Sequence, residues 1–342
     1  EETVEDTGGD DGGDDGGDDG GDDGDDGGDD GGDDGGDDGG DDDVAEAGEE
    51  ASGDVDTEVS EAEDVAQEGG EIAVGLEAEI VGMRPTEDTC GSPCYNIFFS
   101  VYDTFMESAA DGTYQGWLLE SIAPNEDFTA WTGTLRDGVV FHNGNPLTAQ
   151  TVVDMFPIQQ AGAQSAGQIA ASGLAGIEAV GDLDVQWNLN RSNSAFPAFL
   201  ARAQIGMVFD PTVAADLDAW NENPVGTGPF QFVSRDLDNE TILEKNPNYW
   251  AVDSDGIQLP YLDQISFRPI PDEGTRLDAV LSGTTQVAHT LRQGTIRDGR
   301  NARDGGNDLF LYEFQGNNVG GGMFNVLVPP FDDVRVRRGL TK

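Results

Sequence analysis

The sequence predicts a fold of the α/β class after residue 70, and three stretches indicate it. Residues 71–81 alternate apolar and polar side chains, as a half-buried strand does. Residues 131–154 combine a hairpin, a turn and a helix. Residues 95–106 place apolar side chains at helical spacing, namely Ile97, Phe98, Val101, Tyr102 and Phe105.

The stretch 131–154 has the most consistent local signals. Asp137-Gly138 suits a tight turn between strand-like residues at Leu135 and at 139–141, because glycine accepts a positive φ angle. Asn143-Gly144 predicts a second turn. Thr148 is placed to cap a helix whose apolar face is Ala149, Val152, Val153 and Phe156, and Pro157 is expected to end it.

The remaining elements are predicted in the same way. Residues 115–127 indicate a short helix that leads into a turn. Gly226 and Gly228 suit a turn with backbone angles closed to other residues. Residues 272–283 predict a helix that stops at Gly283, and 292–308 predict a loop. Residues 310–314 and 323–328 indicate strands, and a further helix is expected after the acidic pair at 332–333.

The charge is strongly acidic and unevenly divided. The chain has 342 residues, 69 of them acidic and 16 basic, for a formal net charge of −53. Residues 1–71 hold 34 acidic and no basic side chains, so 69 − 34 = 35 acids face 16 bases in the remainder, a net of −19. Nucleic acids and anionic membrane surfaces are therefore poor partners, because both would be repelled.

Residues 8–43 form an almost perfect Gly-Gly-Asp-Asp repeat, and acidic residues continue to residue 70. Like charges repel and glycine raises backbone entropy, so a disordered acidic tail is expected over 1–70. It is either a spacer or a solvated low-complexity tail. A calcium-binding β-roll is disfavoured, because the repeat has a period of four and no apolar position.

Cys90 and Cys94 are separated by three residues, and three interpretations compete. A small disulfide loop in an exported protein is favoured over a pair of thiols, and a redox or metal site is disfavoured. The chain begins with Glu, and it has no apolar run of the roughly 18 to 20 residues that span a bilayer. We therefore expect a processed or truncated piece whose targeting segment is missing.

A series of motifs resembles the extracellular solute-binding proteins of family 5, the peptide, oligopeptide and nickel receptors of ABC importers. In chain order these motifs are VYDTF at 101–105, LLESI at 118–122, LRDGVVFHNGNPLTA at 135–149, NPVGTGPF at 223–230, LEKNPNYW at 243–250, LPYLDQISFR at 259–268, RLDAVLSG at 276–283 and PPFDDVRVR at 329–337. The resemblance covers 72–342. Residues 150–151 and 284–286 lack acidic residues that the family usually has there.

The resemblance implies a two-lobed periplasmic-binding-protein-like receptor. Residues 71–275 would form most of the first lobe, and 276–342 would only begin the second, incomplete lobe, so that the isolated piece would bind solute poorly. The implied function is the substrate-binding component of an ABC transporter. It would capture a small solute, with a peptide expected, and deliver it to the permease subunits. Such a receptor is no enzyme and needs no cofactor.

The same family implies a monomer outside the cytoplasmic membrane, in the periplasm or at the cell surface, anchored through a missing N-terminal segment. The competing function is that of a secreted acidic surface protein whose Asp-rich repeat binds calcium weakly. A phosphate cradle at 226–230 is disfavoured, because no Lys follows the glycines. His142 and His289 lie far apart in the sequence without accompanying ligands, so no metal site is expected.

The candidate residues fall into two groups. Tyr95, Asn96 and Phe98 are expected to contact the ligand, although helix capping is an alternative for Tyr95 and Asn96, and Phe98 also belongs to the apolar helix face. Cys90 and Cys94 are the candidate disulfide. The family-motif residues that are expected to be structural are Leu135, Arg136, Asp137, Gly138, Phe141, His142, Gly144, Gly226, Thr227, Gly228 and Pro229.

Overall fold

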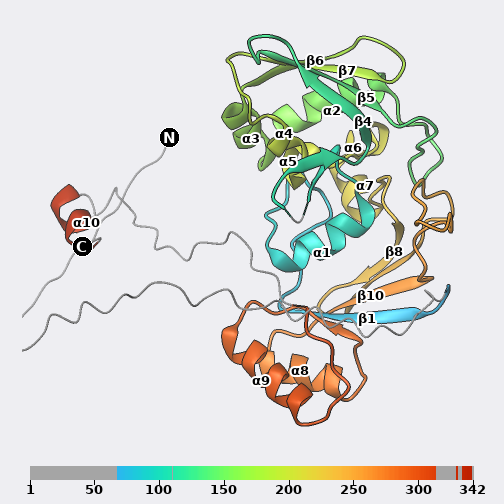
Figure 1. The fold of residues 1–342 in the computed structure, drawn as a ribbon, viewed down its shortest axis with the longest axis vertical. Coiled ribbons are helices and arrows are strands. Elements are labelled where there is room, and N and C mark those ends of the chain that lie inside the picture. The colour runs from blue at the N-terminus through green and yellow to red at the C-terminus, as the bar shows by residue number, and fades with distance from the viewer. Residues whose placement is uncertain (1–67, 110, 313–328, 330–332, 341–342) are drawn as a thin grey trace, which may run out of the picture. The chain divides into compact units, whose positions relative to one another are not determined.

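The computed structural model describes residues 68–109, 111–312, 329 and 333–340 (Figure 1). The acidic repeat and the strands expected at 313–314 and 323–328 lie outside these residues. Within the described ranges, no helix combines the length and the apolar character that crossing a membrane requires.

A five-stranded sheet contains the first strand of the fold. Its order is β11 (Val287–Ala288), β1 (Glu71–Leu76), β10 (Gln264–Pro269), β9 (Glu240–Lys245) and β8 (Phe230–Asp236). β1 is parallel to both of its neighbours, whereas β10, β9 and β8 are antiparallel. The predicted first strand is confirmed from Glu71 and ends at Leu76, where the side chain is buried.

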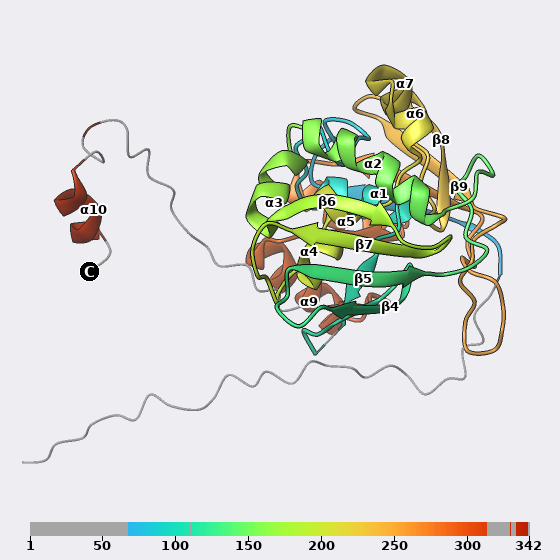
Figure 2. The ribbon, with the colours of Figure 1, turned by 90° about the horizontal axis from the view of Figure 1, so that it is seen from above.

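A four-stranded antiparallel sheet forms a second layer, with the order β4 (Leu119–Pro124), β5 (Ala130–Leu135), β7 (Asp184–Leu189) and β6 (Leu174–Ala179) (Figure 2). β2 (Met106–Ser108) and β3 (Tyr114–Gly116) pair as a separate ribbon. The prediction of a helix at 115–127 is therefore wrong. Those residues extend because β4 pairs with β5 along its length, and strand pairing overrides local helix propensity.

Helices fill the space around and between these sheets (Figure 1). The longer ones are α1 (Ser92–Val101), α2 (Ala149–Ala161) and α3 (Ser165–Ser172). Four short helices follow β7: α4 (Pro197–Leu200), α5 (Ala203–Gly206), α6 (Pro211–Ala214) and α7 (Leu217–Glu222). Buried side chains from both sheets and from α1 and α2 belong to one hydrophobic cluster.

Helix α2 begins as the sequence predicts. Thr148 is its N-cap, and the side chain accepts a hydrogen bond from the backbone N–H of Thr151 at 3.2 Å. Pro157 does not end the helix, which continues to Ala161. A proline inside a helix removes one backbone hydrogen bond. The buried side chains of Met155, Phe156 and Gln159 on either side of it keep the turn packed.

The hairpin expected between Leu135 and residues 139–141 is replaced by a different pairing. Leu135 ends β5, whose partners are β4 and β7, and Val140 forms an isolated bridge with Pro146 instead. The two turn glycines are confirmed, because Gly138 has φ +77° and Gly144 has φ +86°.

The end of the described fold contains three more helices. α8 (Glu273–Leu281) confirms the predicted helix, and Gly283 follows with φ +75°. α9 (Gln293–Asp304) occupies the segment predicted as a loop. Tertiary contact stabilises it, because Thr295 donates a hydrogen bond to Glu273 of α8 at 2.6 Å. Residues 310–312 form no strand, and α10 (Val334–Leu340) confirms the helix expected after 332–333.

The chain remains attached to the first sheet beyond residue 275. β11 pairs with β1, and the fully buried Arg276 donates hydrogen bonds to the backbone carbonyls of Ile270 and His289, just beyond β10 and β11. Gly75 leaves room for this arginine, since a Cβ at residue 75 would lie 3.0 Å from Arg276 Cγ. A lobe boundary at residue 275 would separate β11 from its own sheet.

Candidate functional site

The loop that leads from β1 into α1 is held by side-chain contacts. Arg84 forms an ion pair with Asp88 at 2.8 Å, and the Asp88 carboxylate also accepts the backbone N–H of Arg84 at 2.9 Å. Gly82 allows this arrangement, because a Cβ there would lie 2.2 Å from Asp88 Oδ2. Tyr102 donates from its hydroxyl to the Met83 carbonyl at 2.7 Å. The loop is thus fixed to the core before the helix starts.

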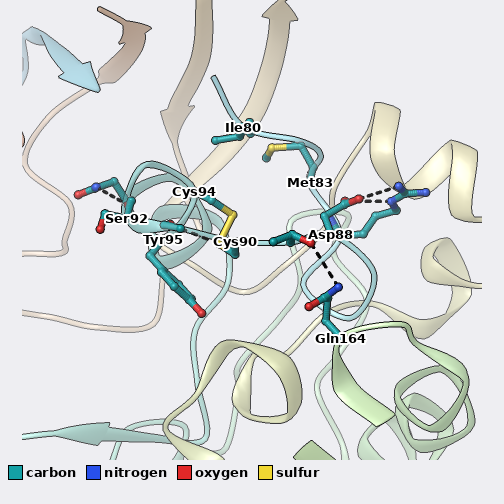
Figure 3. The surroundings of a disulfide bond; sticks show 12 residues. Ile80, Met83, Asp88, Cys90, Ser92, Cys94, Tyr95 and Gln164 are labelled. Carbon is teal, nitrogen blue, oxygen red and sulfur yellow. Dashed lines mark hydrogen bonds and ion pairs between the residues drawn. A yellow bond between two sulfur atoms is a disulfide. The ribbon is translucent and has the colours of Figure 1, made fainter. Parts of the chain in front are cut away.

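The structure joins Cys90 and Cys94 in a disulfide at the start of α1 (Figure 3). Cys94 is buried and belongs to the hydrophobic cluster, and Cys90 packs against the same cluster. Figure 3 shows Tyr95 projecting from the turn that carries the bridge. The bridge therefore connects the anchored loop to the helix.

The three residues predicted to contact ligand differ in their surroundings. Tyr95 is partly buried and stacks on Phe99, with ring centroids 5.9 Å apart. Asn96 donates from its side-chain amide to the Ser92 carbonyl at 2.8 Å, a contact within its own helix. Phe98 is fully buried and packs edge-on against Tyr102. Its ring leaves no surface for a solute, which corrects the expectation for Phe98.

Phe99 lies beside the predicted residues and was not singled out from the sequence. Its side chain is 49% exposed, although it is large and apolar. Tyr95 and Phe99 are four residues apart, so they lie on one face of the helix. Gln204 of α5 donates to the Tyr95 hydroxyl at 3.3 Å, which adds a polar group beside the aromatic pair. The spacing from Tyr95 could have indicated Phe99, whereas Gln204 approaches only through the tertiary fold.

Asp103 lies at the centre of a second cluster, which is buried. One carboxylate oxygen accepts from the Trp117 indole at 2.8 Å and from the Tyr249 hydroxyl at 3.1 Å. The other accepts from the Trp250 indole and the Thr227 hydroxyl, both at 3.1 Å. Burial raises the pKa of Asp103 to about 6, against the opposing effect of its four donors. This single carboxylate therefore connects three distant chain segments.

Two of the family-motif residues, Arg136 and Thr227, contact this buried cluster. Arg136 places its guanidinium carbon 4.7 Å from the ring centroid of Trp250 and donates to the Trp117 carbonyl. Leu135 and Phe141 are buried in the core, and Asp137 lies exposed in its turn. The carbonyl of Pro229 accepts the backbone N–H of Asn246 at 2.9 Å.

His142 joins two motifs that are distant in the sequence. Its Nε2 donates to the Gly228 carbonyl at 3.0 Å, and its Nδ1 accepts the Gly226 backbone N–H at 3.4 Å. Burial lowers the pKa of His142 to about 4, so the ring is neutral and serves as a structural connector. The described residues hold no group of three or more His, Cys, Asp or Glu side chains arranged for a metal ion.

Gly226 and Gly228 have φ angles outside the left-handed region, so the expectation of special backbone angles is wrong for both. They are required for close approach instead. A Cβ at Gly226 would lie 2.2 Å from the Val101 carbonyl oxygen, and one at Gly228 would lie 2.6 Å from it. The backbone of this motif therefore packs directly on the end of α1.

Comparisons with known proteins agree with this architecture. The family model described as bacterial extracellular solute-binding proteins, family 5 Middle, matches residues 113–342, more than half of the chain. The nickel-binding periplasmic protein of Escherichia coli (strain K12) is 28% identical over 192 residues, which are 55% of this chain and 36% of that protein. The dipeptide-binding protein of the same strain is 26% identical over 293 residues, 78% of this chain and 51% of that protein.

Solved structures show the same fold. A dipeptide-binding protein from Pseudoalteromonas sp. SM9913 in complex with Met-Leu superposes with a TM-score of 0.62 at 22% identity, over 79% of this chain and 56% of that one. This chain therefore shares the α/β fold of these binding proteins over the part that it covers, and it spans about half or less of the relatives' length. The chain belongs to the bacterial extracellular solute-binding proteins of family 5.

Proposed function

We propose that this chain is part of a substrate-binding component of an ABC importer, a non-enzymatic receptor that captures a small solute and delivers it to the permease subunits. The family match over residues 113–342 is the observation that carries this proposal. Relatives named for dipeptide, glutathione and nickel binding support a solute of this size class, with peptides preferred. Binding proteins of this kind close two lobes about a hinge around their ligand.

We propose that the solute contacts the first lobe at Tyr95, Phe99 and Gln204. An exposed aromatic ring on a well-packed helix offers a large rigid surface at low entropic cost, and the neighbouring amide offers polar recognition. Asn96 is kept as a candidate, although its amide is used within the helix.

The lobes are best divided after β11. Residues 71–288 would then form the described part of the first lobe, because β11 pairs with β1. The second lobe would begin with the segment that leads into α9. The family is described as one of extracellular solute-binding proteins. For this chain we propose a monomer outside the cytoplasmic membrane, with the acidic residues 1–70 as a spacer to a membrane anchor.

A thermal-shift panel on the full-length gene product tests this function. The panel contains the dipeptide Met-Leu, glutathione, a nickel chelate and mannopinic acid, the solute classes named for relatives and structural neighbours. A true ligand at 100 times its dissociation constant should stabilise the protein by about 2.7 kcal/mol. If no member raises the melting temperature, the proposed solute classes are wrong.

A matched pair of variants then tests the site. Phe99→Ala should weaken binding of the active panel member about tenfold, because it removes a large apolar contact. Leu237→Ala removes an apolar side chain that is 67% exposed in the turn between β8 and β9, and it should leave the affinity unchanged. Equal affinities for the two variants would contradict the placement of the solute on α1. Isothermal titration calorimetry measures the dissociation constants of both variants.

A further inference from the structure

The first turn of α1 contains a proline, Pro93, but it lacks the capping side chain and the acidic residue that often stabilise a helix N-terminus. Its N-cap is Gly91, and among the described residues no side chain caps the turn and no acidic residue stands in it. The first backbone N–H groups of a helix have no partner within the helix, so an uncapped first turn opens easily. Tyr95, which donates its N–H to the Gly91 carbonyl at 3.2 Å, lies at this weak point.

The disulfide lies where a capping motif would lie. Cys90 is the residue before the N-cap, and Cys94 is the third residue of the helix. In helices without such a bridge, a capping box joins the N-cap to the third helical residue, and a hydrophobic staple joins the residue before the N-cap to the fourth. The bridge links the same two parts of the chain covalently.

The loop side of the bridge is itself immobilised. Asp88 is held by Arg84, and the Thr86 carbonyl accepts the backbone N–H of Gln164 at 2.8 Å. The Gln164 side chain also donates to the Thr89 hydroxyl at 3.4 Å (Figure 3). Cys94 is only 3% exposed and packs in the core. The bridge therefore joins a fixed loop to a fixed helix face across an uncapped turn.

We propose that the Cys90–Cys94 disulfide is a positioning device, a covalent staple that keeps the first turn of α1 wound so that Tyr95 and Phe99 present one aromatic surface to the solute. The inference rests on the proposed function for its solute-binding part. It gives the cysteine pair a role in affinity, in addition to its role in stability.

The first test removes the bridge and leaves the core sulfur in place. Cys90→Ser opens the disulfide, and Cys94 stays packed. For a loop of this length, the chain-entropy model gives about a 30-fold change in the equilibrium constant for unfolding. Under conditions where exchange proceeds by local opening, we therefore expect hydrogen exchange of the amides of residues 95–98 to accelerate up to about 30-fold, and by more than that of the amides of α3. Unchanged exchange in the first turn would overturn the proposal, and this readout requires no solute.

The second test restores the turn by a different route. Gly91 has φ −107° and ψ −170°, the extended geometry of an ordinary N-cap. An added Cβ would have its nearest neighbour, Pro93 Cδ, at 3.8 Å. In the Cys90→Ser background, Gly91→Asp supplies a capping carboxylate at the positive end of the helix dipole. It should slow hydrogen exchange of the same amides about threefold relative to Cys90→Ser alone. A staple predicts this rescue, whereas a disulfide that only packs the core does not.

The third test separates positioning from general stability. Thr148→Ala removes the cap of α2, which lies in another element, and lowers the stability of the whole fold. At a temperature well below melting, Cys90→Ser should weaken binding of the active panel member at least fivefold. Adding Gly91→Asp to that variant should recover part of the lost affinity. Thr148→Ala should bind the same solute as tightly as the wild type does. Equal losses in Cys90→Ser and Thr148→Ala would refute positioning. If the wild type binds no panel member, the proposed solute classes are wrong, and the exchange measurements still decide whether the disulfide is a staple.

Discussion

Asp103 shows how much of this lobe depends on one side chain. Its carboxylate accepts donors from Trp117, Thr227, Tyr249 and Trp250, which lie on three separate segments. Each oxygen accepts one indole N–H, which can only donate, and one hydroxyl, which can rotate. Replacing the carboxylate by an amide therefore leaves one indole without an acceptor.

The buried carboxyl should give the protein a distinct pH dependence. The pKa of Asp103 is about 6 in the folded state, because burial disfavours the charge. An unfolded Asp titrates near 3.9, so the stabilising contribution of the neutral carboxyl is fully present below about pH 4 and is lost as the pH rises through about 6. Relative to Asp103→Asn, the wild type should gain up to about 3 kcal/mol of unfolding free energy between pH 7 and pH 4.

Urea unfolding of both proteins at several pH values measures this difference. The variant is the matched control, because every other carboxylate and His142 are common to both chains and cancel. Parallel curves for the two proteins would show that Asp103 does not titrate in this window.

At the scale of elements, α1 is held at both ends. The disulfide holds its start, and the motif with Gly226 and Gly228 packs on the carbonyl of Val101 at its end. The backbone N–H of Gly228 also donates to that carbonyl at 3.0 Å. Only residues without a Cβ allow two stretches of backbone to approach this closely.

Gly226→Ala should therefore destabilise the fold by about 3 kcal/mol, because the new methyl group would overlap the Val101 carbonyl and Tyr102. Gly176→Ala in β6 is the matched control, since an added Cβ there meets no atom of the described residues within 4 Å. It should change stability by less than about 0.5 kcal/mol. Chemical denaturation of both variants checks the prediction. Equal changes in unfolding free energy for the two variants would mean that the backbone near Gly226 moves aside for the new methyl group without loss of stability.

At the scale of the whole molecule, the two regions of sequence are predicted to behave independently. Residues 1–67 supply only five apolar positions other than alanine, at Val4, Val44, Val55, Val59 and Val65, and most of the acidic excess. The five-stranded and four-stranded sheets are joined by one hydrophobic cluster of residues 74–267. That cluster provides the burial that stabilises the fold.

Deletion of residues 1–67 should leave the melting temperature unchanged at 0.15 M salt, where charges more than about 8 Å apart are screened. At about 0.01 M salt the shorter chain should melt higher, because the remaining acidic domain is freed from repulsion by the deleted carboxylates. Differential scanning calorimetry at both salt concentrations checks this. A lower melting temperature for the shorter chain at 0.15 M would show that the acidic region stabilises the fold.

The sequence by itself determined the family, the first strand, the cap at Thr148 and the turns at Gly138 and Gly144. These features depend on neighbours a few residues away, or on motifs read in order. The tertiary structure alone decided that 119–124 is a strand, that Pro157 lies inside a helix, that Phe98 is core and that Gly226 meets Val101. Each of these depends on pairing or close packing between distant segments, which local propensity does not encode.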